Sequence, residues 1–143
     1  MTEYRIRKAS LADEAAVVAL WAACDLTVPY NDPHADFRFA LNKHGSDVLL
    51  ALDVGEKIVG SVMVGHDGHR GWVYYVAAHP NKRNQAIGRT IVEAAENWLK
   101  ERGVCKVQLM VRETNTAVQP FYERLGYEYT PRIVMAKWLK QGG

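Results

Sequence analysis

The sequence predicts a single α/β domain in which about four helices pack on a mixed central sheet of six to seven strands. Three observations support this fold class. Segments with strand-like apolar patterns alternate along the chain with segments whose apolar residues recur at helical spacing. The 143 residues suffice for one substantial core. No repeat, low-complexity tract or Pro/Ser-rich linker suggests a boundary, so we expect one domain over residues 1–143, in the order β-α-α-β-β-β-α-β-α-β-β.

The N-terminal half is expected to hold a strand, two helices and a hairpin. YRIRKA alternates and predicts the first strand. Ser10 suits the N-cap of the helix that follows, which should end near Cys24 because TVPYNDP has the composition of a turn. The predicted apolar face of this helix holds Leu11, Ala15, Val18, Trp21 and Ala22. A short helix is expected from about Asp36 to Lys43, and DVLLALD with IVGSVMVG predicts the hairpin.

The C-terminal half is expected to alternate strands and helices before a closing pair of strands. WVYYVAA is almost wholly apolar, which predicts a central strand. The next helix should run from about Ile87 to Arg102 and stop at Gly103. Its apolar stripe comprises Ile87, Ile91, Ala94, Ala95, Trp98 and Leu99. KVQLMV predicts a strand, Asn115 to Leu125 a helix, and YEYT with IVMAKWLK the final two strands.

Composition argues against several kinds of protein. A formal net charge of +2, with Lys and Arg scattered along the chain, does not favour a nucleic-acid or membrane-surface partner. LADEAAVVALWAAC is too short to span a bilayer and contains two acidic residues, and no signal-peptide pattern precedes it. Cys24 and Cys105 make no disulfide framework and lack the company of a metal site, so we expect buried thiols, no metal and a cytoplasmic protein.

The turn PNKRNQAIGR, which follows the predicted central strand, has the features of an anion site. A helix that opens near Ala86 to Gly88 presents unpaired N–H groups and a partial positive charge, which suits a phosphate or pyrophosphate. Lys82, Arg83 and Arg89 add positive charge, and Gly88 would allow close approach of the backbone. The alternative is an ordinary strand-to-helix connection with solvated basic residues. Neither the Walker nor the dinucleotide-binding glycine pattern is present.

A second motif, NTAVQPFYERLGY, lies about thirty residues further on. Asn115 can cap a helix here, and Pro120 is acceptable only in its first turn. Phe121 and Leu125 are spaced to face the core, whereas Tyr122 points elsewhere and is either a half-buried aromatic or a functional phenol.

Taken together, VAAHPNKRNQAIGR and NTAVQPFYERLGY resemble the two motifs of the GCN5-related N-acetyltransferase (GNAT) family, and the predicted element order is similar to that fold over essentially the whole chain. Six residues fall on motif positions with the correct spacing, namely Arg83, Gly88, Asn115, Tyr122, Gly126 and Tyr127.

The resemblance implies that acetyl-CoA lies where two neighbouring parallel strands, WVYYVAA and KVQLMV, splay apart. Backbone groups of Val76, Ala77 and Ala78 would pair with the acetyl and pantetheine amides, backbone amides from Asn84 to Arg89 would wrap the pyrophosphate, and Asn115 would bind the pantetheine arm. The implied cofactor-binding set is Val76, Ala77, Ala78, Arg83, Asn84, Gln85, Ala86, Ile87, Gly88, Arg89, Asn115 and Tyr122.

The resemblance also implies direct attack of an amine on the thioester, without a covalent enzyme intermediate. Tyr122 would protonate the leaving thiolate. A strand amide near Ala77 or Ala78 would stabilise the negative charge on the carbonyl oxygen. The implied activity is acetyl transfer from acetyl-CoA to a small amine, a protein N-terminus or a lysine, and the alternative is a non-catalytic CoA-binding or regulatory domain.

The sequence departs from the family pattern at three places. Ala86 occupies the usual first glycine and Val118 the usual alanine, which are small changes. More seriously, the two common positions of the carboxylate base fall at Trp72 and Met110, and neither side chain can accept a proton. Asp67 or His69 in the loop DGHRG could supply the base, or water could relay the proton; the other interpretation is that these residues decorate an exposed loop.

The acceptor is not identified by the sequence, because two candidate regions imply opposite charges. In the loop CDLTVPYNDPHADF, Asp25 or Asp32 could bind a cationic amine while Tyr30 or Phe37 packs on its aliphatic part. The cluster His66, Asp67, His69 and Arg70 could instead bind an acidic group. Exposed final strands could support a homodimer.

Overall fold

The computed structural model describes residues 4–82 and 86–140. It divides into two compact units, Met1–Leu109 and Met110–Gly143, which are considered separately below. The expectation of one domain over the whole chain stays a prediction.

The first unit is built on a five-stranded sheet whose strands are β1 (Arg5–Lys8), β2 (Ser46–Leu52), β3 (Ile58–His66), β4 (Gly71–Ala78) and β5 (Val107–Gln108). The strands lie side by side in chain order, with antiparallel pairing from β1 to β4 and parallel pairing between β4 and β5. The predicted hairpin is confirmed as β2 and β3. The predicted central strand is confirmed as β4, which lies between β3 and β5.

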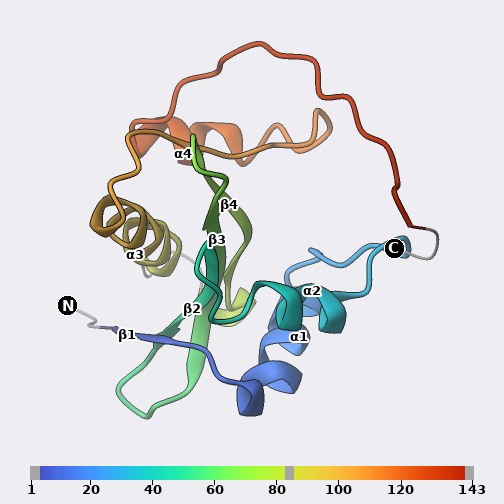
Figure 1. Ribbon diagram of the computed structural model, residues 1–143. Coiled ribbons are helices and arrows are strands. Elements are labelled where there is room, and N and C mark those ends of the chain that lie inside the picture. Colours follow the sequence, from blue (N-terminus) through green and yellow to red (C-terminus); the bar gives the residue numbers. More distant parts are fainter. Residues whose placement is uncertain (1–3, 83–85, 141–143) are drawn as a thin grey trace. The chain divides into compact units, whose positions relative to one another are not determined.

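Helices cover both faces of this sheet, α3 (Ile87–Glu101) on one face and α1 (Glu14–Ala23) with α2 (Pro33–Ala40) on the other (Figure 1). Because both faces are covered, β2 is apolar and buried along nearly its whole length rather than alternating. The predicted mixed α/β layer architecture is therefore confirmed.

Helix α3 follows its predicted stripe closely. Its buried residues are Ile87, Ile91, Val92, Ala95, Trp98 and Leu99. Two glycines let the helix approach the sheet: a Cβ at Gly60 would lie 2.6 Å from Ile87 Cγ2, and one at Gly71 would lie 2.6 Å from Leu99 Cδ1. The helix stops at Gly103, whose φ of 78° suits a glycine, and the amides of Gly103 and Val104 donate to the carbonyls of Lys100 and Leu99 as in a Schellman motif.

The predicted apolar face of the first helix is only partly confirmed. Trp21 is buried and Val18 packs on the core, but the other buried residues are Val17 and Leu20, and Leu11 is 65% exposed. The reason is that Leu11–Asp13 form a separate 3₁₀ turn, η1, which takes Leu11 out of phase with the α-helix. Helix α2 also begins earlier than predicted, at Pro33, because the Asp32 carboxylate caps it by accepting from the amides of His34 and Ala35.

The second unit contains one short helix, α4 (Gln119–Arg124), with Pro120 in its first turn as predicted. Its N-cap is Val118, so the expectation that Asn115 caps it is wrong. The helix ends in a Schellman motif, in which Tyr127 donates to the Tyr122 carbonyl and Gly126 to that of Glu123, with Gly126 at a φ of 96°.

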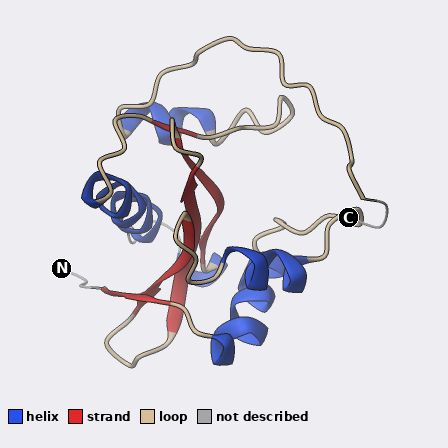
Figure 2. Ribbon diagram, in the orientation of Figure 1, coloured by secondary structure: helices blue, strands red, loops and turns tan. Residues whose placement is uncertain are grey.

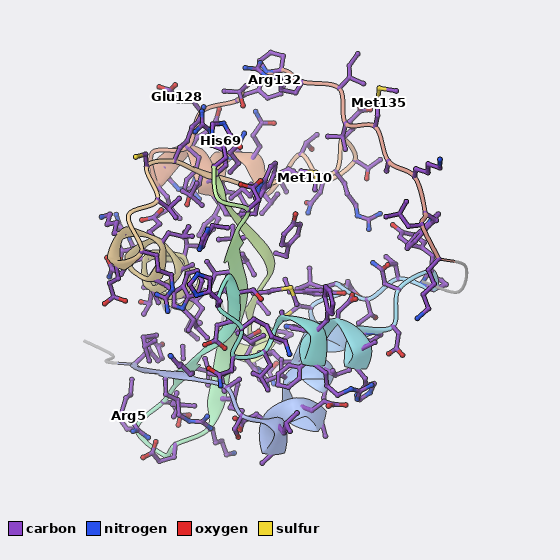
Figure 3. The ribbon with its side chains drawn as sticks, in the orientation of Figure 1. Arg5, His69, Met110, Glu128, Arg132 and Met135 are labelled. Carbon is purple, nitrogen blue, oxygen red and sulfur yellow. The ribbon has the colours of Figure 1, made fainter. Side chains whose placement is uncertain are left out.

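The described sheet has five strands rather than six or seven. KVQLMV forms a strand only at Val107–Gln108, and the described part of the second unit holds no strand, so the closing pair is drawn as loop in Figure 2. Alternating apolar residues specify the faces of a strand but not its hydrogen-bonding partner. The large apolar side chains there are exposed, including Tyr129, Ile133, Val134, Met135 (Figure 3), Trp138 and Leu139.

Candidate active site

Among the residues that the structure describes, no strand pairs with one edge of β4 over its C-terminal half, and this edge is called open below. Strands β4 and β5 pair only at Gly71 with Val107 and at Trp72 with Gln108, whereas β4 continues to pair with β3 as far as Ala78. Beyond the strand, His79 donates its amide to the Val59 carbonyl of β3. Because successive residues of a strand point their amides to opposite edges, the amide of Ala78 is directed to the edge away from β3.

A β-bulge at Tyr75 accompanies the point where β4 leaves β5 behind. Met63 pairs with Tyr74 and Ser61 with Ala77, so β4 carries one residue more than β3 across this interval. Tyr75 takes a φ of 51°, which strains a bulky side chain by about 1–3 kcal/mol. Such strain persists only where neighbouring contacts hold it.

Two contacts hold Tyr75. Its ring stacks on Trp21 at a centroid distance of 3.9 Å and an interplanar angle of 11°, and its hydroxyl donates to Asp36 Oδ2 at 2.7 Å. Burial first, and then the hydrogen bond to Asp36, raises the pKa of the Tyr75 phenol. The phenol therefore stays protonated and acts as a hydrogen-bond donor at neutral pH.

The C-terminal end of α1 is tied to β3 and to the end of β4. Trp21 Nε1 donates to Ser61 Oγ at 3.0 Å, and Cys24 Sγ donates to the Ala78 carbonyl at 3.2 Å. Cys24 is half-buried. Cys105 is exposed, because it lies in the connection that precedes β5, so the expectation of a buried thiol is wrong there.

The predicted anion turn is described in part. Pro80–Lys82 form a 3₁₀ turn, and Arg83, Asn84 and Gln85 lie outside the described residues. Helix α3 begins at Ile87, and its first backbone bond runs from the Thr90 amide to the Ala86 carbonyl. The amides of Ile87, Gly88 and Arg89 therefore have no partner within α3, and amides in this position commonly bind anions. Ala86 itself lies at a φ of 62°.

In the second unit, Tyr122 is half-buried between two aromatic rings. Its ring meets the edge of Phe121 at 4.9 Å and that of Tyr127 at 5.7 Å. Burial raises the pKa of the Tyr122 phenol to about 12, so the proton is retained at neutral pH. Asn115 is exposed, and its amide donates to the Arg112 carbonyl in the turn before α4.

The loop between β3 and β4 holds both proposed bases at its exposed tip, where His69 is visible in Figure 3. Asp67 Oδ1 accepts the amides of Arg70 at 2.8 Å and His69 at 2.9 Å. These bonds, that from Arg70 first, lower the pKa of the Asp67 carboxyl. Asp67 is thus a turn-forming residue and a weak base, whereas the side chain of His69 is exposed to solvent.

The acceptor candidates of the loop between α1 and α2 have different surroundings. Asp25 is exposed at a φ of 58° and Tyr30 is also exposed, whereas Asp32 is the α2 cap and Phe37 is wholly buried in the core. The sequence did not single out Asp36 or Tyr75. The strand WVYYVAA contains two adjacent tyrosines, Tyr74 and Tyr75, and the sequence does not distinguish between them.

No helix of the described residues combines the length and the apolar character that crossing a bilayer requires. The described residues bring together no group of three or more His, Cys, Asp or Glu side chains suited to a metal ion.

Comparison with known proteins connects the fold and these motifs to one family. The model of the acetyltransferase (GNAT) family matches residues 15–127. Acetyltransferase ECA0875 of Pectobacterium atrosepticum is 46% identical over 127 residues, 89% of each chain, and acetyltransferase YE1169 of Yersinia enterocolitica is 42% identical over 134 residues, 94% of each. The solved structure of AAC(6')-Iy, in complex with a CoA-based bisubstrate analogue, has a TM-score of 0.80 at 16% identity over 95% of this chain and 98% of that one, and supports the fold.

Proposed function

The chain belongs to the acetyltransferase (GNAT) family and is an N-acetyltransferase. We propose that it transfers the acetyl group of acetyl-CoA directly to a primary amine of a small molecule, a protein N-terminus or a lysine. The observation that carries this proposal is the open edge of β4, which leads through a short turn to the N-terminus of α3. The open edge suits the extended thioester arm of acetyl-CoA, and the helix N-terminus suits its pyrophosphate.

The open edge would bind the acetyl and pantetheine amides. Backbone groups of Val76, Ala77 and Ala78 pair with the arm as an added strand pairs with a sheet, and the outward amide of Ala78 is the donor available for this. In the second unit, the proposed partner of the same arm is Asn115.

The start of α3 would bind the pyrophosphate. The amides of Ile87, Gly88 and Arg89 carry the interaction together with the helix dipole. The neighbouring Ala86 belongs to the same proposed set, as do Arg83, Asn84 and Gln85, which lie outside the described residues.

The chemistry requires an electrophile, a leaving group and a proton balance. The amine nitrogen attacks the carbonyl carbon, the outward amide of Ala78 stabilises the oxyanion, and the C–S bond then breaks. Tyr122 gives its proton to the leaving thiolate, and the raised pKa of its phenol keeps that proton in place until the thiolate forms. The proton that the amine loses balances the one that the thiolate gains.

The amine proton would leave through water or through His69. The lowered pKa of the Asp67 carboxyl makes Asp67 a weak base. Trp72, at one of the family's base positions, lies in β4 and donates its indole N–H to Asp67 Oδ2 at 3.4 Å, so it contributes no basic group.

A thiol-release assay with acetyl-CoA and a panel of primary amines tests the proposal. We expect Tyr122→Phe to lower kcat by roughly 10²–10⁴-fold, because it removes the general acid, while calorimetry shows that CoA still binds. Tyr129→Phe, at an exposed tyrosine of the same unit, is the matched control and should leave kcat unchanged. Tight CoA binding without turnover of any amine would instead identify a non-catalytic CoA-binding domain.

A further inference from the structure

Asp36 has a different charge environment from Asp13 and Glu14, two other partly buried carboxylates of the first unit. Asp13 is paired with Arg7 at 2.8 Å, and Glu14 with Arg38 at 2.7 Å. Among the side chains that the structure describes, those of residues 4–81 and 86–140, no Lys, Arg or His nitrogen lies within 4.0 Å of the Asp36 carboxylate. A half-buried carboxylate without a cation is costly, because its charge is partly removed from water and is not compensated.

Asp36 also lies next to the proposed acetyl site. Its partner Tyr75 is the residue immediately before Val76 in β4, so the carboxylate reaches the strand through one hydrogen bond of 2.7 Å. Two contacts connect α1 to β4 near this point: the ring of Tyr75 stacks on Trp21, and the Cys24 thiol donates to the Ala78 carbonyl.

The bond from Tyr75 leaves Asp36 with the capacity to bind a ligand. A carboxylate can accept about four hydrogen bonds, and an ammonium group offers both the missing charge and up to three donors. The Tyr75 hydroxyl orients the carboxylate. The backbone of Tyr75 is strained at its positive φ, and the stack on Trp21 and the bond to Asp36 hold it in that conformation.

We propose that Asp36, oriented by Tyr75, binds the ammonium group of the acetyl acceptor, so that the enzyme selects amines that are cationic. This inference rests on the proposed acetyltransferase function and names the acceptor class for that site. It assigns the recognition to Asp36 rather than to Asp25, which is exposed, or to Asp32, whose carboxylate already caps α2.

A binding experiment tests this without turnover. The CoA-bound protein is titrated with butylammonium, with butanol as neutral probe and butyrate as anionic probe, while NMR follows the backbone signals of Asp36 and Tyr75. We expect butylammonium alone to shift these signals, and Asp36→Asn to abolish the shift. The amide oxygen of Asn can still accept from Tyr75, so this variant keeps the hydrogen bond and loses only the charge. Equal shifts from butanol, no shift from butylammonium, or an unchanged shift in Asp36→Asn would each overturn the proposal.

Steady-state kinetics with any amine found in the panel gives an independent measurement. Asp36→Asn should raise the KM of a cationic amine roughly 10–100-fold, in line with the loss of a charge-assisted bond, and leave the KM of acetyl-CoA unchanged. Tyr75→Phe, which keeps the ring on Trp21, should raise the amine KM less. Glu101→Gln, at an exposed carboxylate of α3, controls for net charge.

The comparison with Asp25→Asn decides between the two acidic candidates. Asn tolerates the positive φ of Asp25, so this change removes only charge. A raised amine KM in Asp25→Asn together with a normal one in Asp36→Asn would contradict the assignment. Failure of the proposed function itself is separate, because it would abolish thiol release while butylammonium binding remained measurable.

Discussion

The two faces of the sheet are built on different principles. On the α3 face, apolar side chains meet glycines, and Gly60 and Gly71 allow the helix to lie close to the strands. On the α1 and α2 face, three polar contacts cross the interface: Trp21 with Ser61, Tyr75 with Asp36, and Cys24 with Ala78. Apolar packing tolerates small sliding movements, whereas each hydrogen bond fixes two particular atoms. The difference indicates that close apolar packing positions α3 on the sheet, whereas specific polar contacts position α1 and α2.

Removing Trp21 should have the largest effect on stability, because this side chain makes both an apolar stack and a polar contact. It is wholly buried, stacks on Tyr75 and donates to Ser61. We expect Trp21→Ala to lower the free energy of unfolding by about 3–5 kcal/mol, measured by urea denaturation. Trp21→Phe keeps a ring against Tyr75 and leaves the Ser61 hydroxyl without this donor, so it should cost only about 1–3 kcal/mol. Equal losses in the two variants would show that the polar contact, not the ring, dominates this face.

Gly60→Ala tests the close fit of the opposite face. The new Cβ would lie 2.6 Å from Ile87 Cγ2 and 3.2 Å from the Ala77 carbonyl oxygen. We expect a loss of about 1–3 kcal/mol in the free energy of unfolding, since overpacking forces the helix or the strand to shift. Gly55→Ala is the control: its Cβ would lie 3.4 Å from Asp53 Oδ1 and its φ is not positive, so a change within about 0.5 kcal/mol is expected. A tolerated Gly60→Ala would mean that α3 is not held by close contact.

The α3 face was also the part of the fold that the sequence specified best. A long stripe at helical spacing and a glycine stop predicted α3 to within a residue or two, since both signals are local. The first helix was misjudged because its 3₁₀ start changes the phase of the pattern. The closing strands were expected from alternation alone, which does not reveal whether a partner strand is present.

The candidate site divides in the same way. The anion turn and the position of Tyr122 follow from motifs, because the residues of each motif are neighbours in sequence. The pair of Asp36 and Tyr75 could not be predicted, because its members are 39 residues apart and meet only after β4 bulges. Nothing in WVYYVAA marks which tyrosine takes a positive φ.

The smallest predicted effect concerns the two non-glycine residues of positive φ that flank the proposed acetyl-CoA site. Tyr75, on the α1 and α2 face, is held by a stack and a hydrogen bond. Ala86, at the start of α3, has only a methyl group and cannot be held in this way. A left-handed alanine costs roughly 1–2 kcal/mol, and glycine costs about 0.4–1 kcal/mol through the unfolded chain. We therefore expect Ala86→Gly to raise the free energy of unfolding by up to about 1 kcal/mol in urea denaturation.

Ala94→Gly is the matched control within the same helix. Ala94 lies in the interior of α3, where the same substitution relieves no strain and should lower the free energy of unfolding by about 1 kcal/mol. Opposite signs for the two changes in the free energy of unfolding would show that the helix start is strained. They would also explain why the family pattern has glycine at the position of Ala86, since glycine adopts a positive φ without strain. A loss of similar size at both positions would contradict this, and would place Ala86 among ordinary helix-flanking residues whose conformation costs nothing.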